Sequence, residues 1–218
     1  MTTDARRRRS YSGTGSQART RLARTAVVDA ARALFLERGY AGTTIEAISD
    51  LSDVPPATVY RLFSSKLGIL KGLLDVSIAG DDDAVPLQDR PRVRAVLADP
   101  DPRNQLSGFA GLARGIMSRT EPIHQILVSA AGADPGAAAL LAEQTRHRQQ
   151  GQAGIARSLA RVGALRPELR ERDAADIIHA LMSPEVYRLL VGDRGWSPQR
   201  YERWLSRILI DQLTPPAG

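Results

Sequence analysis

Apolar residues recur along this 218-residue chain at the three- and four-residue spacing of an α-helix. The first apolar stripe consists of Val27, Ala30, Ala31, Leu34 and Phe35. Arg38 then suits the negative end of the helix dipole, and Gly39 stands where a glycine commonly ends a helix. The pattern therefore predicts one long amphipathic helix that ends at about residue 38.

Three shorter helices are predicted to follow. The first begins at Thr43, which would form a reciprocal capping box with Glu46, and its buried face consists of Ile45, Ile48 and Leu51. After a break at residues 52–55, Pro55 and Pro56 open a second helix with Val59, Leu62 and Phe63 as its apolar residues. Ser64 and Ser65 cap a third helix from Lys66, which would bury Leu67, Leu70, Leu73 and Leu74.

The remainder of the chain also has a helical pattern, punctuated by prolines. After a solvated connection near residues 81–91, helices are expected over residues 91–98, 103–119, 121–131, 136–162, 173–191 and 198–213. Ser197 would cap the last of them, with Pro198 in its first position. The predicted fold class is all-α, with about nine to ten helices and without an internal repeat. We expect a disordered basic tail over 1–19, a helix-turn-helix domain over 20–78 and a second helical domain over 79–218.

Charge separates the two domains. Residues 1–78 contain 12 Arg and Lys against 7 Asp and Glu, whereas residues 79–218 contain 18 against 17. The positive first third, which includes the run Arg6–Arg9, favours a polyanionic partner, with the run as a mobile arm or only a solvated tail. The chain lacks cysteine, a secretory signal and an apolar stretch of membrane-spanning length, so we expect a cytoplasmic protein without disulfides.

Two short helices joined by a tight break, after a longer helix, are typical of a helix-turn-helix. Its second helix would place Ala57, Thr58, Tyr60 and Arg61 outward. Short, hydroxylated, aromatic and cationic side chains of this kind approach base edges and phosphates in a major groove. The pattern therefore predicts a DNA-binding helix at 56–63, within a helix-turn-helix at about 44–63.

These residues also resemble the DNA-binding domain of the TetR family of bacterial regulators. The resemblance covers about residues 20–78 and rests on Gly39-Tyr40, Thr43-Thr44, Ile48, Val54 and the run Ala57–Lys66. A weaker resemblance to a C-terminal domain of part of that family covers 181–190 and 195–198. The sequence departs from the family pattern at Asp53 in the turn, at Ser49 and Ser52, and at Pro55, which stands where a serine cap is usual.

The resemblance implies a set of functional residues. The residues expected at the DNA are Thr44, Pro55, Pro56, Ala57, Thr58, Tyr60, Arg61 and Lys66, with Thr44, Tyr60 and Lys66 at the backbone and Thr58 and Arg61 at base edges or flanking phosphates. It further implies a homodimer built by helices 173–191 and 198–213, and a palindromic operator. A small-molecule effector would release the DNA, and the residues that could line its pocket are Phe109, Met117, Leu127 and Met182. The expected function is a ligand-responsive repressor, with activation left open.

The sequence leaves two other functions as alternatives. A basic-tailed protein that binds RNA or an anionic membrane surface would depend on residues 1–19. A helical enzyme would need a catalytic pair, but His124, His147 and His179 do not lie at metal-ligand spacing, and a phosphate-binding glycine loop is absent from the sequence. We therefore expect neither an enzyme nor a cofactor or metal site, and we expect double-stranded DNA to be the partner.

Overall fold

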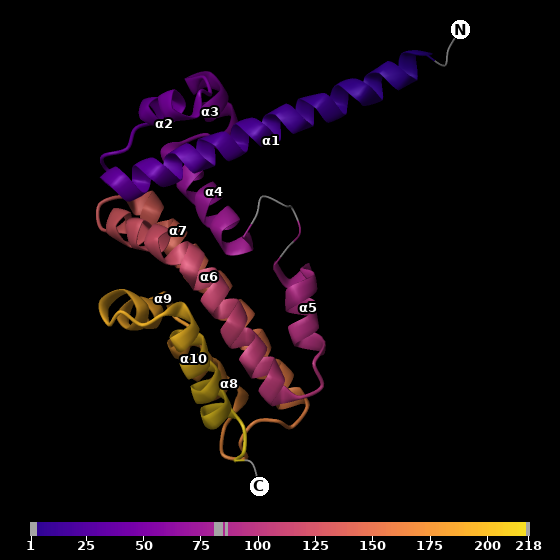
Figure 1. The fold of residues 1–218 in the computed structure, drawn as a ribbon, viewed down its shortest axis with the longest axis vertical. Coiled ribbons are helices and arrows are strands. Elements are labelled where there is room, and N and C mark those ends of the chain that lie inside the picture. The colour runs from indigo at the N-terminus through magenta and orange to yellow at the C-terminus, as the bar shows by residue number, and fades with distance from the viewer. Residues whose placement is uncertain (1–3, 81–84, 86, 217–218) are drawn as a thin grey trace. The chain divides into compact units, whose positions relative to one another are not determined.

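The computed structural model describes residues 4–80, 85 and 87–216, which form helices and loops without a β-strand (Figure 1). The all-α prediction is confirmed. The chain divides into two compact units, residues 1–76 and 77–218. The α-helices are α1 (Asp4–Arg38), α2 (Ile45–Ser52), α3 (Pro56–Phe63), α4 (Lys66–Ala79), α5 (Pro91–Ala98), α6 (Pro102–Ala131), α7 (Pro135–Arg161), α8 (Glu171–Leu181), α9 (Pro184–Tyr187) and α10 (Pro198–Leu213). Two further turns are η1 (Leu87–Asp89, a 3₁₀ helix) and η2 (Arg188–Asp193, a π-helix).

The first helix is longer than its apolar stripe predicted. We expected disorder over 1–19, but α1 begins at Asp4. Within its described side chains, the Thr20 hydroxyl donates to the Ser16 carbonyl at 2.9 Å and the Arg19 Nε donates to the Gly15 carbonyl at 3.3 Å. These i to i−4 bonds follow the helical repeat, so the polar segment continues the helix that its apolar neighbours anchor.

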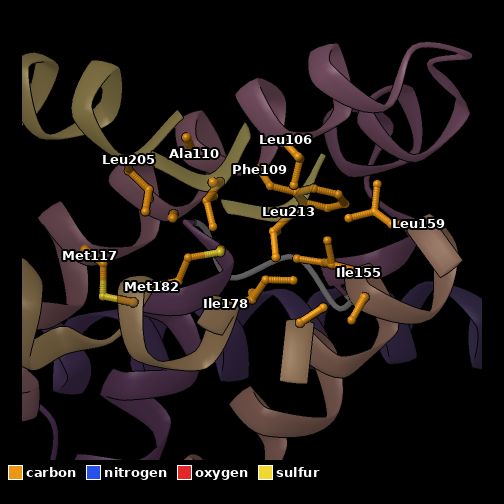
Figure 2. Close-up of a cluster of buried hydrophobic side chains, with 14 of the residues drawn as sticks. Leu106, Phe109, Ala110, Met117, Ile155, Leu159, Ile178, Met182, Leu205 and Leu213 are labelled. Atoms are coloured by element: carbon orange, nitrogen blue, oxygen red, sulfur yellow. The ribbon is translucent and has the colours of Figure 1, made fainter. Parts of the chain in front are cut away.

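The second unit is built around α6, which packs against α10 and α7, while α8 packs against α7. Much of its core is one apolar cluster (Figure 2). The fully buried members include Leu106, Ala110, Ala156, Leu159, Ala174, Ile178, Tyr201, Leu205, Leu209 and Leu213. They recur at helical spacing on each helix, so the helices share one core.

Two predicted helix boundaries in this unit were wrong. Pro122 was expected to separate two helices, but α6 runs through it, because Met117, Thr120, Ile123 and Leu127 are buried at helical spacing on both sides of the proline. Conversely, the helix predicted over 173–191 ends at Leu181, because Pro184 cannot continue it and Ser183 instead caps α9 by accepting the Val186 N–H.

The last turn of α4 is held by an arginine of α6. The Arg119 Nε donates to the Ser77 carbonyl at 2.9 Å, and its Nη2 donates to the Ile78 carbonyl at 3.2 Å. Gly80 follows with a φ of 92°, and a Cβ there would meet the guanidinium at 3.3 Å. A positive charge at the carboxyl end of a helix is favourable, so Arg119 fixes where α4 ends.

Replacing Leu205 with Ala tests the apolar cluster. Leu205 is fully buried, so truncation should lower the free energy of unfolding of the second unit by about 2–5 kcal/mol. Leu189→Ala is the matched control, since Leu189 is 51% exposed, and should change it by less than about 0.5 kcal/mol. Urea unfolding followed by far-UV circular dichroism measures both, and equal effects of the two substitutions would contradict this packing.

Candidate DNA-binding surface

The helix-turn-helix consists of α2 and α3, and both helices pack against α1. The side chains that close this small core are Val27, Ala31, Leu34, Phe35, Ile45, Ile48, Val54, Val59 and Phe63. Leu51, which we expected in the core, is 57% exposed. Residues on a helix are about 100° apart, so Leu51 lies about 60° beyond Ile48, on the side away from the buried Ser49.

The start of α2 lies one residue later than predicted. Thr44 is the N-cap, and its hydroxyl accepts the Ala47 N–H at 3.1 Å. Thr43 is fully buried and its hydroxyl donates to the Gly39 carbonyl at 2.8 Å, so the capping box predicted for Thr43 and Glu46 was wrong. Thr43 therefore closes the end of α1, and Thr44 lies exposed at the positive end of α2, where phosphate is favoured.

Three of the four residues that depart from the family pattern, Ser49, Ser52 and Asp53, lie in or next to the turn between α2 and α3. Asp53 adopts the left-handed conformation with a φ of 53°, which costs free energy for a residue with a Cβ. The hydroxyl of the buried Ser49 donates to the Val54 carbonyl at 2.6 Å, and Ser52 donates to the Ser49 carbonyl at 3.2 Å. The serine hydroxyls thus donate hydrogen bonds to backbone carbonyls of this turn and help to hold it, although the left-handed conformation of Asp53 is unfavourable.

One side of α3 is buried and the other is open. Val59 and Phe63 are buried, whereas Ala57, Tyr60 and Arg61 are exposed, with Tyr60 at 48%. Thr58 is half-buried at the edge of the exposed side, and Pro55 and Pro56 are exposed at its beginning. Pro55 makes no side-chain cap bond, as expected for a proline in the cap position. The outward side therefore presents one methyl group, one phenol and one guanidinium at i, i+3 and i+4 spacing.

Lys66 does not extend from the domain as a phosphate ligand would. Its ammonium donates to the carbonyls of Tyr40 and Thr43 at 2.7 and 2.9 Å, and it lies 4.3 Å from the centre of the Tyr40 ring. The first residue of α4 is thereby tied to the loop between α1 and α2. The structure gives Lys66 a positioning role, and its predicted phosphate contact has no support from this geometry.

Arg24 has a similar positioning role for α3. The sequence did not predict this role. Its Nη1 donates to the Leu62 carbonyl at 3.2 Å, and its guanidinium lies 4.5 Å from the centre of the Phe63 ring. These contacts fix the carboxyl end of α3 against α1. The sequence contained no signal for this pair, because the two residues are far apart in the chain and Arg24 lies among other arginines.

The four residues predicted to line an effector pocket are all buried. Phe109, Met117 and Met182 belong to the apolar cluster of the second unit, and Leu127 on α6 is fully buried (Figure 2). A separate surface groove of about 380 Å³ is lined by Ser107, Glu202, Arg203, Ser206, Arg207, Ile210 and Asp211. The four predicted residues do not line this groove, and their part in ligand binding stays a prediction.

Neither a membrane span nor a metal cluster was found in the part of the chain that was described. There, the helices are too short or too polar to cross a bilayer. The same residues contain no group of three or more His, Asp or Glu side chains placed to hold a metal ion.

The sequence matches a model of bacterial regulatory proteins of the tetR family over residues 27–73. Two curated relatives are similar over more of the chain. YdeS of Bacillus subtilis, an uncharacterized HTH-type transcriptional regulator, is 28% identical over 76% of this chain and 77% of its own length. TcmR of Streptomyces glaucescens, an HTH-type transcriptional regulator, is 28% identical over 66% of this chain and 62% of its own length.

Solved structures of regulators share the fold. The ketosteroid regulator KstR2 of Mycobacterium tuberculosis has a TM-score of 0.57 at 18% identity, covering 88% of this chain and 95% of its own. A transcriptional regulator from Saccharomonospora viridis, solved with choline, has a TM-score of 0.66 at 19% identity, covering 89% of this chain and 98% of its own. At these identities the likeness concerns the helical architecture.

Replacing Ser49 with Ala tests the turn. The substitution removes a donor from the buried Val54 carbonyl and should lower the free energy of unfolding of the first unit by about 1–3 kcal/mol. Ser52→Ala is the control: the Ser49 carbonyl still accepts the Asp53 N–H, so the loss should be about 0.5 kcal/mol. Thermal unfolding measures both variants, and a larger loss of stability in S52A than in S49A would contradict these hydrogen bonds of the turn.

Proposed function

We propose that this chain is a DNA-binding transcriptional regulator with a helix-turn-helix of the TetR type, and that it acts as a dimeric repressor that a small molecule releases from a palindromic operator. The observation that carries the DNA-binding role is the division of α3 into a buried side with Val59 and Phe63 and an exposed side with Ala57, Tyr60 and Arg61. A helix held in this way can enter a major groove without losing its own packing.

Each exposed residue has a chemical role in this proposal. Arg61 donates to a guanine edge or a flanking phosphate, and the Tyr60 hydroxyl donates to the sugar-phosphate backbone. Ala57 and the half-buried Thr58 approach base edges, where short side chains allow close contact. Thr44 and the first turn of α2 face a phosphate. Pro55 and Pro56 have no N–H to offer a phosphate, so they act by shape at the start of α3.

Dimerisation follows from the size of the reading unit. One eight-residue helix reads few base pairs, and a two-fold dimer doubles the contacts on a palindromic site. We place the dimer contact on α8 and α10, as the family resemblance implies. The domains we assign are the DNA-binding domain over 20–78 and the effector and dimerisation domain over 79–218.

Release by an effector requires a mechanical route from the second unit to the first. Helix α4 supplies one, because it begins in the first unit at Lys66 and ends in the second, where Arg119 of α6 holds its last carbonyls. A displacement of α6 on ligand binding would move the end of α4, and Lys66 would carry that movement to the loop before α2. The regulator from Saccharomonospora viridis was solved with choline, which supports a small molecule as effector in this fold.

Replacing Arg61 with Ala tests the reading helix. The change should weaken operator binding by about 1–3 kcal/mol for each protomer and lower the steepness of the salt dependence. Tyr60→Ala should likewise weaken binding while the dimer persists. Fluorescence anisotropy with labelled duplex at two salt concentrations measures both effects.

The matched control for Arg61 is Arg94→Ala. Arg94 carries the same charge and is exposed on α5 of the second unit, away from the helices that we assign to the dimer contact, so its loss should leave operator affinity within about twofold. Equal losses in R61A and R94A would reduce the effect to net charge and remove α3 from the interface. Undiminished binding in R61A and Y60A together would show that the DNA is read elsewhere.

Selection of bound duplexes from a random pool tests the dimer. A two-fold dimer should enrich inverted repeats whose half-site centres lie about 34–36 Å apart, one helical turn, or a multiple of it. Enrichment of a single half-site, or of no sequence, would contradict the proposed assembly. Sedimentation velocity of the protein with and without DNA gives the stoichiometry independently.

A further inference from the structure

We propose that His124, Arg148 and Glu185, backed by Gln152 and His179, bind the head group of a neutral, mainly apolar ligand that carries a carbonyl or hydroxyl oxygen. This inference rests on the proposed ligand-responsive function and names the chemistry of its effector. The five polar side chains come from four helices, α6, α7, α8 and α9, that pack together in the second unit.

Part of this polar cluster is fixed by hydrogen bonds. The Gln152 side chain is buried, its Oε1 lies 2.7 Å from the His179 Nδ1, and its Nε2 donates to the Met182 carbonyl at 3.3 Å. The amide of Gln152 is thus used at both ends, and it links α7 to α8 and to the break between α8 and α9. A polar group of this kind inside an apolar core needs such partners to be tolerated.

The other part of the cluster is left incomplete. The His124 Nδ1 and the Arg148 Nε are both buried, and neither has a hydrogen-bond partner among the described residues. Leaving a buried donor unpaired costs about as much as losing a hydrogen bond, so native structures seldom do it without a functional reason. Two such atoms, within one group of interacting side chains, indicate that a partner from outside the chain completes the site.

The charges around these atoms indicate which partner fits. Burial, together with the charge of Arg148, lowers the pKa of both His124 and His179 below the ordinary value, so both rings are neutral at neutral pH. Burial would raise the pKa of Glu185, but hydrogen bonding at the start of α9 and the charge of Arg148 outweigh it and lower the pKa, so this side chain is ionised. The cluster therefore holds one positive and one negative charge.

This balance favours a neutral head group. A ligand carboxylate would be attracted by Arg148 but repelled by Glu185, and a ligand ammonium the reverse, so neither ion gains enough to offset the loss of its hydration. A carbonyl or hydroxyl oxygen accepts from the Arg148 Nε–H without adding charge, and a hydroxyl or a second acceptor suits the His124 Nδ1 in one of its two tautomers. Either group would satisfy the two unpaired atoms.

Buried apolar residues adjoin the cluster on its inner side, whereas Glu185 lies exposed at its outer edge. On α6, His124 lies next to the fully buried Ile123, with the fully buried Leu127 one turn away. Met182, whose carbonyl accepts from Gln152, belongs to the apolar cluster together with Met117 (Figure 2). Unbranched methionines repack readily around a guest, so an apolar ligand body can be accommodated beside the polar cluster.

The experiment uses the full chain and matched pairs of probes. Isothermal titration compares the ketones cyclohexyl methyl ketone and 1-acetonaphthone with their respective carboxylate counterparts, cyclohexanecarboxylate and 1-naphthoate. We expect at least one ketone to bind, and its carboxylate counterpart to bind at least tenfold more weakly. Binding by none of the ketones, or tighter binding by the carboxylates, would overturn the proposal.

Two substitutions locate the bound ketone. Arg148→Lys keeps the positive charge beside Glu185 but removes the Nε–H, and His124→Phe removes the second unpaired atom; each should weaken ketone binding at least tenfold. The controls Arg146→Lys and His147→Phe alter exposed residues of α7, two and one positions before Arg148, and should leave it within twofold. Equal ketone affinity in R148K and R146K would overturn the assignment.

The melting temperature of the ligand-free protein separates ligand binding from a structural role. Because R148K and H124F remove buried atoms that lack partners, their melting temperatures should equal or exceed that of the unaltered chain. A lower melting temperature with unchanged ketone binding would show that these atoms are bridged within the fold, for instance by water, and would overturn the proposal.

Operator affinity is measured in parallel and reports on the proposed function alone. If a ketone binds at the cluster but does not weaken operator binding, the ligand site stands and effector-driven release fails. If operator binding is intact but R148K binds ketones as the unaltered chain does, the DNA-binding role stands and the ligand site fails.

Discussion

An eight-residue helix is too short to persist in water, so the whole DNA-facing surface depends on the burial of one side of α3. Val59 and Phe63 are buried, and the Arg24 guanidinium holds the Leu62 carbonyl and covers the Phe63 ring. The apolar side of α3 is therefore packed against the rest of the domain. The exposed side, with Tyr60 and Arg61, is therefore fixed in direction and need not be ordered again on binding.

The cationic side chains of the two units have different hydrogen-bonding roles. Arg24, Lys66 and Arg119 each donate to backbone carbonyls at helix ends or in the adjoining loop, and so they set where α3 ends, where α4 begins and where it stops. Arg148 instead lies in a polar cluster with a nitrogen that no described residue satisfies. A cation whose donors bind acceptors within the fold has none to offer, whereas the unpaired Nε–H of Arg148 is available to a ligand.

Local chemistry predicted several elements of the structure. The apolar stripe of α1, the glycine at its end, the prolines that open α3 and the Ser197 cap of α10 were each predicted and found, because each depends on residues within one or two helical turns. One error occurred where two local signals competed. Thr43 and Thr44 could each cap α2. The cap is Thr44, because Thr43 is buried and its hydroxyl donates to the Gly39 carbonyl instead.

The sequence by itself determined an all-helical protein with a basic helix-turn-helix near its start, since periodicity, capping and charge are properties of neighbouring residues. Only the tertiary structure decided which cations are engaged internally, that α6 runs through Pro122, and that His124 and Arg148 hold unpaired buried atoms. The physical reason is that hydrogen-bond satisfaction and burial depend on groups distant in the chain, and no local pattern records which of them will meet.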